Sequence, residues 1–273
     1  MSEPAESRHL PDTDRLSILA ATILLAYALA SLIDIPGREL SLQLPGMYVE
    51  VQYNTRTFVA VLVAGLTATG ADWLLRDHPA LGNKSTIQHW LLPALTALVI
   101  GLPLSQMPIG PLWWVGFAIA GGVLMLVLLA EYIVVDPTDT RQAPATVLLT
   151  AVSFALFLAL AVTLRSAGFR LFLVLPSLTF AAGLVSLRTL HLRLHGKWAF
   201  LNAGIIALII GQLAAALHYW PLSPVSYGLL LLGPAYALTS LFASLLEDVP
   251  FRQAITEPVI VLVIVWGVAY WIR

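Results

Sequence analysis

The chain has 273 residues, of which 59% are hydrophobic and 11% are charged, and its formal net charge is −1. Soluble domains carry about 25% charged residues, so the charges here are too few to cover a water-exposed surface. The composition therefore excludes an ordinary soluble globule and gives no sign of nucleic-acid binding, and the absence of cysteine excludes disulfides, thiolate metal sites and iron–sulfur clusters.

The sequence predicts an all-α integral membrane protein, a polytopic bundle of about nine transmembrane helices with a small extramembrane β-hairpin. A helix of about 20 apolar residues crosses the hydrocarbon core of a bilayer. Residues 1–14 form a polar tail, expected to be flexible and without the features of a signal peptide, and residues 15–273 form a single transmembrane domain. The predicted spans are residues 15–35, 57–76, 89–107, 111–133, 142–165, 169–188, 198–219, 225–246 and 256–272.

Lysine and arginine indicate how the chain is oriented, because they are enriched in cytoplasmic loops. With nine spans, nine of the 14 basic residues lie on the side of the N-terminus and five lie on the opposite side. We therefore expect a multi-pass protein of the cell membrane, of the bacterial inner-membrane type, with the N-terminus in the cytoplasm and the C-terminus outside.

The segment 38–56 differs from the rest of the chain because apolar and polar residues alternate on both sides of Pro45 and Gly46. A period of two residues predicts strands, and Pro-Gly suits the tight turn between them. We expect this hairpin on the outer face, either as a cap over the helices or as a docking surface for a partner.

Two similar motifs, LPALT at 92–96 and LPSLT at 175–179, lie in the third and sixth predicted spans. They suggest that spans two to four and spans five to seven are copies of one three-helix unit. Such copies would have opposite orientations in the membrane, a design known in transporters. Chance similarity between common membrane residues is the alternative.

Two prolines, Pro176 and Pro234, lie in the middle of predicted spans. Each removes a helix hydrogen bond and leaves a carbonyl that lipid cannot satisfy, so each kink is expected to face protein or a cavity. Polar residues after the second kink would satisfy it or line a pocket, while packing kinks and interhelical hydrogen bonds are the plainer interpretation. The ligand or cavity candidates are Pro176, Ser177, Gln212, Pro234, Tyr236 and Thr239.

A second set of candidates is polar and lies toward the predicted cytoplasmic side. Asp72 and Arg76 are four residues apart, the spacing of an ion pair within a helix. Glu131 lies near the end of the fourth span, where an acid is either functional or within the headgroup zone.

Asp136 and Asp139 form a D-x-x-D pair, which in membrane enzymes holds Mg²⁺ for a diphosphate substrate. This stretch distantly resembles the start of the CDP-alcohol phosphotransferase motif, but the glycine and arginine expected after the second aspartate are absent. Pro137 instead favours a turn followed by the cap of the fifth span.

The basic segment from Arg188 to Lys197 contains His191 and His195, four residues apart as in a helical metal pair. The interleaved cations discourage a metal ion, so no metal is predicted. The alternative is a cytoplasmic boundary that binds anionic lipid headgroups.

The absence of a recognisable catalytic motif favours a non-enzymatic protein: a membrane scaffold or complex subunit, or a binder of a small apolar ligand or lipid. The alternatives are a secondary transporter with its site at the kinked sixth and eighth helices, and a membrane enzyme acting on a lipid diphosphate. We expect no cofactor and no nucleic acid. The expected partners are membrane lipids, other membrane proteins or a second copy of the chain.

Overall fold

The contacts in the computed structural model divide the chain into two compact units, residues 1–145 and 146–273, and each is described by itself. Within residues 30–58 only the backbone of the helices and strands is described. The residues that the structure describes are 13–32, 38–44, 47–53, 55–76, 78–82, 85–194 and 196–272.

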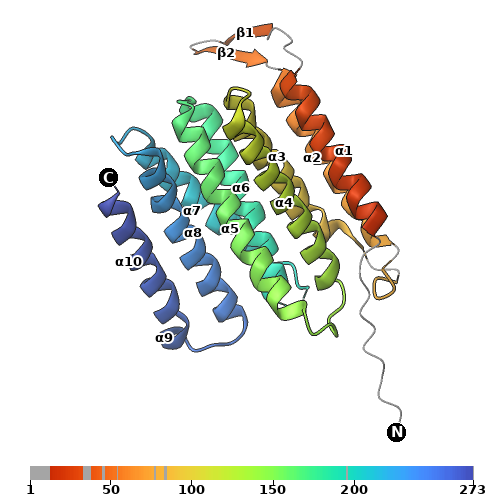
Figure 1. The fold of residues 1–273 in the computed structure, drawn as a ribbon. Helices are drawn as coiled ribbons and strands as arrows, with labels where there is room; N and C mark the ends of the chain where they lie inside the picture. The colour runs from red at the N-terminus through yellow and green to blue at the C-terminus, as the bar shows by residue number, and fades with distance from the viewer. Residues whose placement is uncertain are drawn as a thin grey trace. The chain divides into compact units, whose positions relative to one another are not determined.

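The described residues of unit 1 form four long helices, a short 3-10 helix and two strands. Pro111 begins α4, where its missing N–H costs no helix hydrogen bond. The elements are α1 (Thr13–Leu32), β1 (Arg38–Leu44), β2 (Met47–Tyr53), α2 (Thr55–Arg76), η1 (Ile87–His89), α3 (Leu91–Gln106) and α4 (Pro111–Val134) (Figure 1).

The two strands pair antiparallel, from Arg38 opposite Tyr53 to Leu44 opposite Met47. They lie in the segment for which the sequence predicts a hairpin. The predicted Pro45-Gly46 turn and the strand side chains lie outside the described residues, and the position of the hairpin relative to the membrane remains a prediction.

Three glycines allow α1 to pack closely against the other helices of unit 1. A Cβ atom added at any of them would come within 3.0 Å of a side chain of α1. One of these side chains, Tyr27, also donates a hydrogen bond from its hydroxyl to the carbonyl of Ala97 in α3. Close approach at small residues is the usual way in which helices associate in lipid. The three pairs are Gly70 of α2 with Leu19, Gly101 of α3 with Tyr27, and Gly121 of α4 with Leu24.

Unit 2 is helical throughout its described residues. The Ser223 hydroxyl accepts a hydrogen bond from the Ser226 amide at 3.2 Å, which caps the helix that begins at Pro224. Its elements are α5 (Gln142–Ser166, whose first four residues belong to unit 1), α6 (Leu171–Arg193), α7 (Phe200–His218), α8 (Pro224–Leu246), α9 (Phe251–Ala254) and α10 (Thr256–Trp271) (Figure 1).

The carbonyl that Pro234 leaves without a helix partner in α8 is hydrogen-bonded from α10, which lies beside α8 (Figure 1). Pro234 has no N–H, so the carbonyl of Leu230 has no partner within the helix. The indole N–H of Trp266 donates to that carbonyl at 3.3 Å. A Cβ atom on Gly233 would lie 3.2 Å from the same indole, so the glycine makes room for it. The donor therefore comes from another helix, and the polar residues after Pro234 have different partners.

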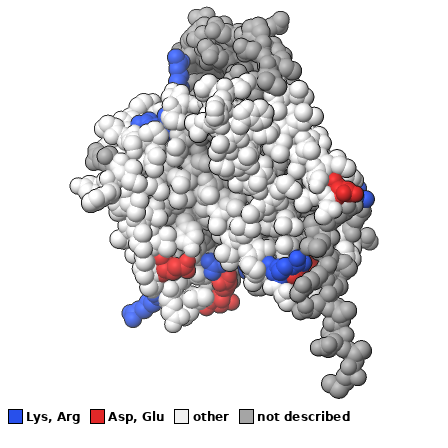
Figure 2. Space-filling model, viewed as in Figure 1, with Lys and Arg blue, Asp and Glu red and all other residues white. Residues whose placement is uncertain are grey.

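Eight helices in the described part of the chain are long and apolar enough to cross a membrane: α2 to α8, and α9 together with α10. Many of their large apolar side chains are exposed, among them Leu201 at 77% and Leu112 at 71%. Figure 2 shows that most described atoms on the visible face belong to uncharged residues. Such a surface suits lipid and not water, so the prediction of an all-α polytopic membrane protein is confirmed. The count of nine spans, with α1 as the first, and the orientation stay predictions.

Candidate functional site

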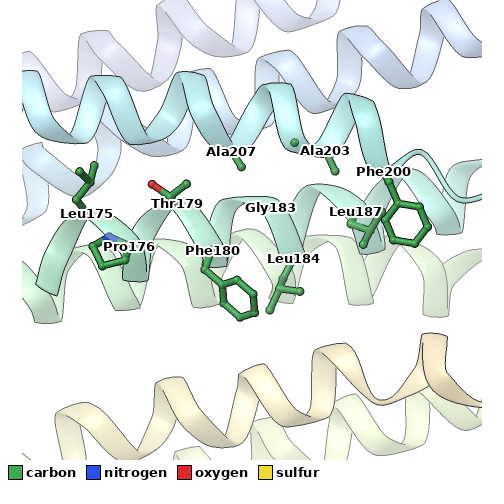
Figure 3. A pocket seen from close by; sticks show the side chains of 11 residues that line it. Leu175, Pro176, Thr179, Phe180, Gly183, Leu184, Leu187, Phe200, Ala203 and Ala207 are labelled. Atoms are coloured by element: carbon green, nitrogen blue, oxygen red, sulfur yellow. The ribbon is translucent and has the colours of Figure 1, made fainter. Parts of the chain in front are cut away.

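An apolar groove runs between α6 and α7 and has a volume of about 610 Å³. Thr179 provides the one polar side chain among the residues that line it (Figure 3). The remaining lining residues are Leu175, Pro176, Phe180, Gly183, Leu184, Leu187, Phe200, Ala203, Gly204 and Ala207.

Small residues determine where α6 and α7 touch and where they separate. A Cβ atom on Gly183 would lie 3.3 Å from the Cβ of Ala207, so the backbones approach closely there. A Cβ atom on Gly204 would meet nothing within 4 Å, so the groove is open at that residue. Phe180 and Phe200 border the opening and are 68% and 65% exposed. The result is an open trough for an apolar chain, with no acid, base or nucleophile other than one hydroxyl among its lining side chains.

A polar pocket of about 510 Å³ lies where α6 ends, α7 begins and α8 ends. The Trp198 ring in its wall stacks on Phe200 of the groove, with ring centroids 5.2 Å apart and planes inclined by 8°. Groove and pocket are therefore joined through one aromatic pair. The pocket is lined by Arg193, Leu194, Lys197, Trp198, Ala199, Asn202, Leu246 and Glu247.

Unit 1 contains a buried pair that joins η1 to the end of α4. The Nδ1 atom of His89 lies 2.7 Å from Oε2 of Glu131, and the two side chains are 4% and 1% exposed. The other ring nitrogen of His89 lies 3.1 Å from Nε2 of Gln88. The sequence identifies Glu131 but not its partner. Glu131 is buried within the protein, and a buried carboxylate requires such a partner.

The predicted ion pair within α2 is confirmed, since Nε of Arg76 lies 2.7 Å from Oδ2 of Asp72. The Thr86 hydroxyl donates to the other oxygen of the same carboxylate. The pair therefore links the end of α2 to the residues just before η1 and serves a structural purpose.

Asp136 and Asp139 form the turn and cap that one interpretation of the sequence predicts. Oδ1 of Asp136 accepts hydrogen bonds from the amide and hydroxyl of Thr138, at 2.9 and 2.7 Å. Oδ1 of Asp139 accepts from the amide of Arg141 at 2.8 Å, just before α5 begins, and its carboxylate also pairs with the Arg141 guanidinium.

The bonds from Thr138 hold the pKa of Asp136 below its usual range, and those from Arg141 do the same for Asp139. The stabilisation is thus present above the ordinary carboxyl pKa and is lost as the pH falls through the lowered value. Among the described residues, no group of three or more His, Asp or Glu side chains is arranged to hold a metal ion.

The first three cavity candidates lie in different surroundings. Pro176 lines the apolar groove. Ser177 is exposed and donates to the Leu173 carbonyl in its own helix at 2.7 Å. Gln212 is exposed on α7. The structure therefore brings one of these three to the groove.

The other three candidates, in α8, do not line the groove. Pro234 is buried, next to Gly233, against which α10 packs. The Tyr236 hydroxyl donates to Oε1 of Glu257 at 2.7 Å. Thr239 is buried, donates to the Ala235 carbonyl at 2.7 Å and lies 3.0 Å from the Ser186 hydroxyl. These contacts account for each polar group through a neighbour in α8 or in a helix beside it.

The basic segment is split between the interior and the surface. Arg188 and His191 are 2% and 4% exposed, and the His191 ring lies against Trp198 with centroids 4.3 Å apart. His195 lies outside the described residues, so the predicted histidine pair is not described. Arg193 and Lys197 reach the polar pocket.

The apolar helices long enough to cross a membrane, eight in the described part of the chain, define the class of this protein as a polytopic membrane protein. A family model matches residues 35–272, and the chain belongs to that family, DUF5656, described as a protein of unknown function. The matched range begins after α1 and includes the groove, the pocket and the His89–Glu131 pair. Comparisons with curated proteins and with solved structures found no match.

Proposed function

We propose that this protein binds the hydrocarbon chain of a lipid, or a similar apolar ligand, in the groove between α6 and α7. The observation that carries the proposal is the groove itself, about 610 Å³ in volume and lined by one hydroxyl among otherwise apolar side chains. Ligand sites are concave, mostly apolar and about 300–1,000 Å³ in volume. We place the protein in the cell's inner membrane, where acyl chains are the most abundant apolar groups.

The groove supports a ligand-binding role over the other non-enzymatic role, a scaffold or complex subunit, because a scaffold requires no cavity. A transporter with its site at the kinked helices would use Ser177, Gln212, Tyr236 and Thr239 together. The first two are exposed and the last two have partners in or beside α8. A lipid-diphosphate enzyme would need Asp136 and Asp139 to hold a metal, and both are engaged in the turn and cap.

The test fills the groove with a side chain. In Gly204→Leu the new side chain would occupy open space in the groove, so we expect the variant to fold and to lose the ligand. Gly267→Leu in α10 is the matched control, because a Cβ atom there also meets nothing within 4 Å and the residue lies outside the groove. Native mass spectrometry of the two purified variants and the wild type measures the bound lipid.

The expected result is a bound lipid or apolar molecule in the wild type and in Gly267→Leu, and its loss in Gly204→Leu. Equal occupancy in Gly204→Leu and Gly267→Leu would contradict the proposal.

A further inference from the structure

We propose that the polar pocket at the junction of α6, α7 and α8 binds a phosphate group, either that of a phospholipid headgroup or free phosphate. Two cations line this pocket, Arg193 and Lys197, and one carboxylate, Glu247. These side chains leave one net positive charge in a cavity of about 510 Å³.

The two cations have different roles. Arg193 is held in place because its guanidinium lies 3.2 Å from Oε2 of Glu247 and 3.4 Å from the Ser240 hydroxyl. A guanidinium has five N–H donors, so these contacts leave donors for a ligand. Lys197 is exposed, and no acidic side chain in the described part of the chain forms an ion pair with it. Lys197 therefore supplies the charge that a phosphate would neutralise.

Neutral donors complete the pocket. The Asn202 amide and the Trp198 indole are in its wall. Ala199, also in the wall, precedes the 19-residue helix α7 and provides no side-chain cap. The first amides of α7 therefore add donors and a positive helix end to the charge of Lys197.

The pocket adjoins the groove through the stacked rings of Trp198 and Phe200. A phospholipid with its phosphate at Lys197 and an acyl chain along α6 would occupy both the pocket and the groove. This part of the inference rests on the proposed function. Arg188, which the sequence places in the same basic segment, is buried and does not line the pocket. The proposed anion site therefore uses the last residues of the basic segment, Arg193 and Lys197, and not Arg188 at its start.

The experiment compares two lipids with identical acyl chains, phosphatidylglycerol and diacylglycerol, which lacks the phosphate. Both are added in equal amounts to the full-length protein in detergent, and native mass spectrometry measures the ratio retained. We expect the wild type to retain about five times more phosphatidylglycerol than diacylglycerol. This factor corresponds to the attraction between one basic residue and an anionic lipid headgroup. Lys197→Gln should bring the ratio near one. Arg252→Gln is the matched control, an exposed cation on the same predicted side that does not line the pocket.

Titration of lipid-free protein with inorganic phosphate, followed by ³¹P relaxation, separates the two sources. If inorganic phosphate binds and the binding requires Lys197, the site also accepts free phosphate. If inorganic phosphate does not bind but the protein still selects phosphatidylglycerol, the site is specific for a lipid headgroup. Equal retention of the two lipids by the wild type, with no Lys197-dependent binding of phosphate, would overturn the inference, as would equal effects of Lys197→Gln and Arg252→Gln. A preference for phosphatidylglycerol that survives Gly204→Leu supports the pocket even if the groove proposal fails.

Discussion

At the scale of single residues, lipid makes every unpaired polar group costly, and the carbonyl of Leu230 shows how this protein responds. Pro234 removes its helix partner, and Trp266 of α10 supplies an indole N–H at 3.3 Å. The hydrogen bond therefore links α10 to α8 at the turn that Pro234 interrupts.

Trp266→Phe should lower the free energy of unfolding by about 1–3 kcal/mol, because it leaves the Leu230 carbonyl unsatisfied. In a Pro234→Ala background, the alanine N–H restores the helix bond, so the same substitution should cost less. Reversible unfolding in mixed micelles measures both effects. An equal cost of Trp266→Phe in the two backgrounds would show that its ring packs but does not satisfy the kink.

The buried pair of His89 and Glu131 predicts strong coupling between the two positions. Glu131→Leu or His89→Leu alone removes one partner of a pair 2.7 Å apart and should cost about 3–5 kcal/mol. The double substitution should cost less than the sum of the single ones. A double-mutant cycle on unfolding free energies tests this, and additive effects would count against a coupled pair.

The sequence predicts residue contacts when they are local. Asp72 and Arg76 are one helical turn apart, so their pairing follows from spacing alone. His89 and Glu131 are 42 residues apart, and their contact depends on how α3 packs against α4. One signal was available: His89 begins the third predicted span and Glu131 lies near the end of the fourth, so both are predicted on the same side of the membrane.

At the scale of elements, α1 is held in unit 1 by glycines that admit its side chains. Gly101→Ala should lower the melting temperature, because its Cβ atom would lie 2.6 Å from the Tyr27 ring, which is also held by a hydrogen bond to Ala97. We expect a cost of about 1–3 kcal/mol from overpacking.

Gly122→Ala in α4 is the control for this prediction. A Cβ atom there meets nothing within 4 Å, so the change should be neutral or stabilising by up to about 1 kcal/mol through helix propensity. The melting temperatures of both variants are measured by thermal unfolding in detergent. Equal melting temperatures would show that the packing of α1 does not depend on close contact at Gly101.

The length of each apolar stretch predicts that a helix is present, but the residues at which the helix begins and ends depend on local sequence. The last predicted span, 256–272, is the end of a longer helical segment in which α9 stops at Ala254 and α10 begins at Thr256. Pro258 has no N–H to bond the Ala254 carbonyl, which explains the break. The groove was harder to predict. Pro176, a predicted candidate, lies in one of its walls, but the groove is open because of Gly204 in the next helix, and the sequence does not show which helices are neighbours.

At the scale of the whole molecule, the orientation in the membrane follows from the basic residues and can be tested cleanly, because the chain has no cysteine. We expect Ala167→Cys, between α5 and α6, to react with a membrane-impermeant maleimide in intact cells. Thr140→Cys, before α5, should react only after the cells are permeabilised. The opposite pattern would reverse the predicted topology.

The proposed internal repeat also belongs to this scale. The boundary between the two compact units follows Ala145, four residues into the fifth predicted span (142–165), which is close to where one copy would end and the next begin. Superposition of α2–α4 on α5–α7 with an inverted direction would establish the repeat. Unrelated crossing angles in the two sets of helices would leave the LPALT and LPSLT motifs as a coincidence.

The most direct test of the central claim is where an acyl chain contacts the protein in a membrane. The protein is reconstituted in vesicles containing a phospholipid with a photoreactive diazirine on its acyl chain, and adducts are mapped by mass spectrometry after illumination. We predict adducts concentrated in 175–187 and 200–207, strongly reduced by Gly204→Leu, with labelling of the exposed α10 surface unchanged. Adducts spread evenly over α10 and the groove, and unaffected by Gly204→Leu, would contradict a lipid site between α6 and α7.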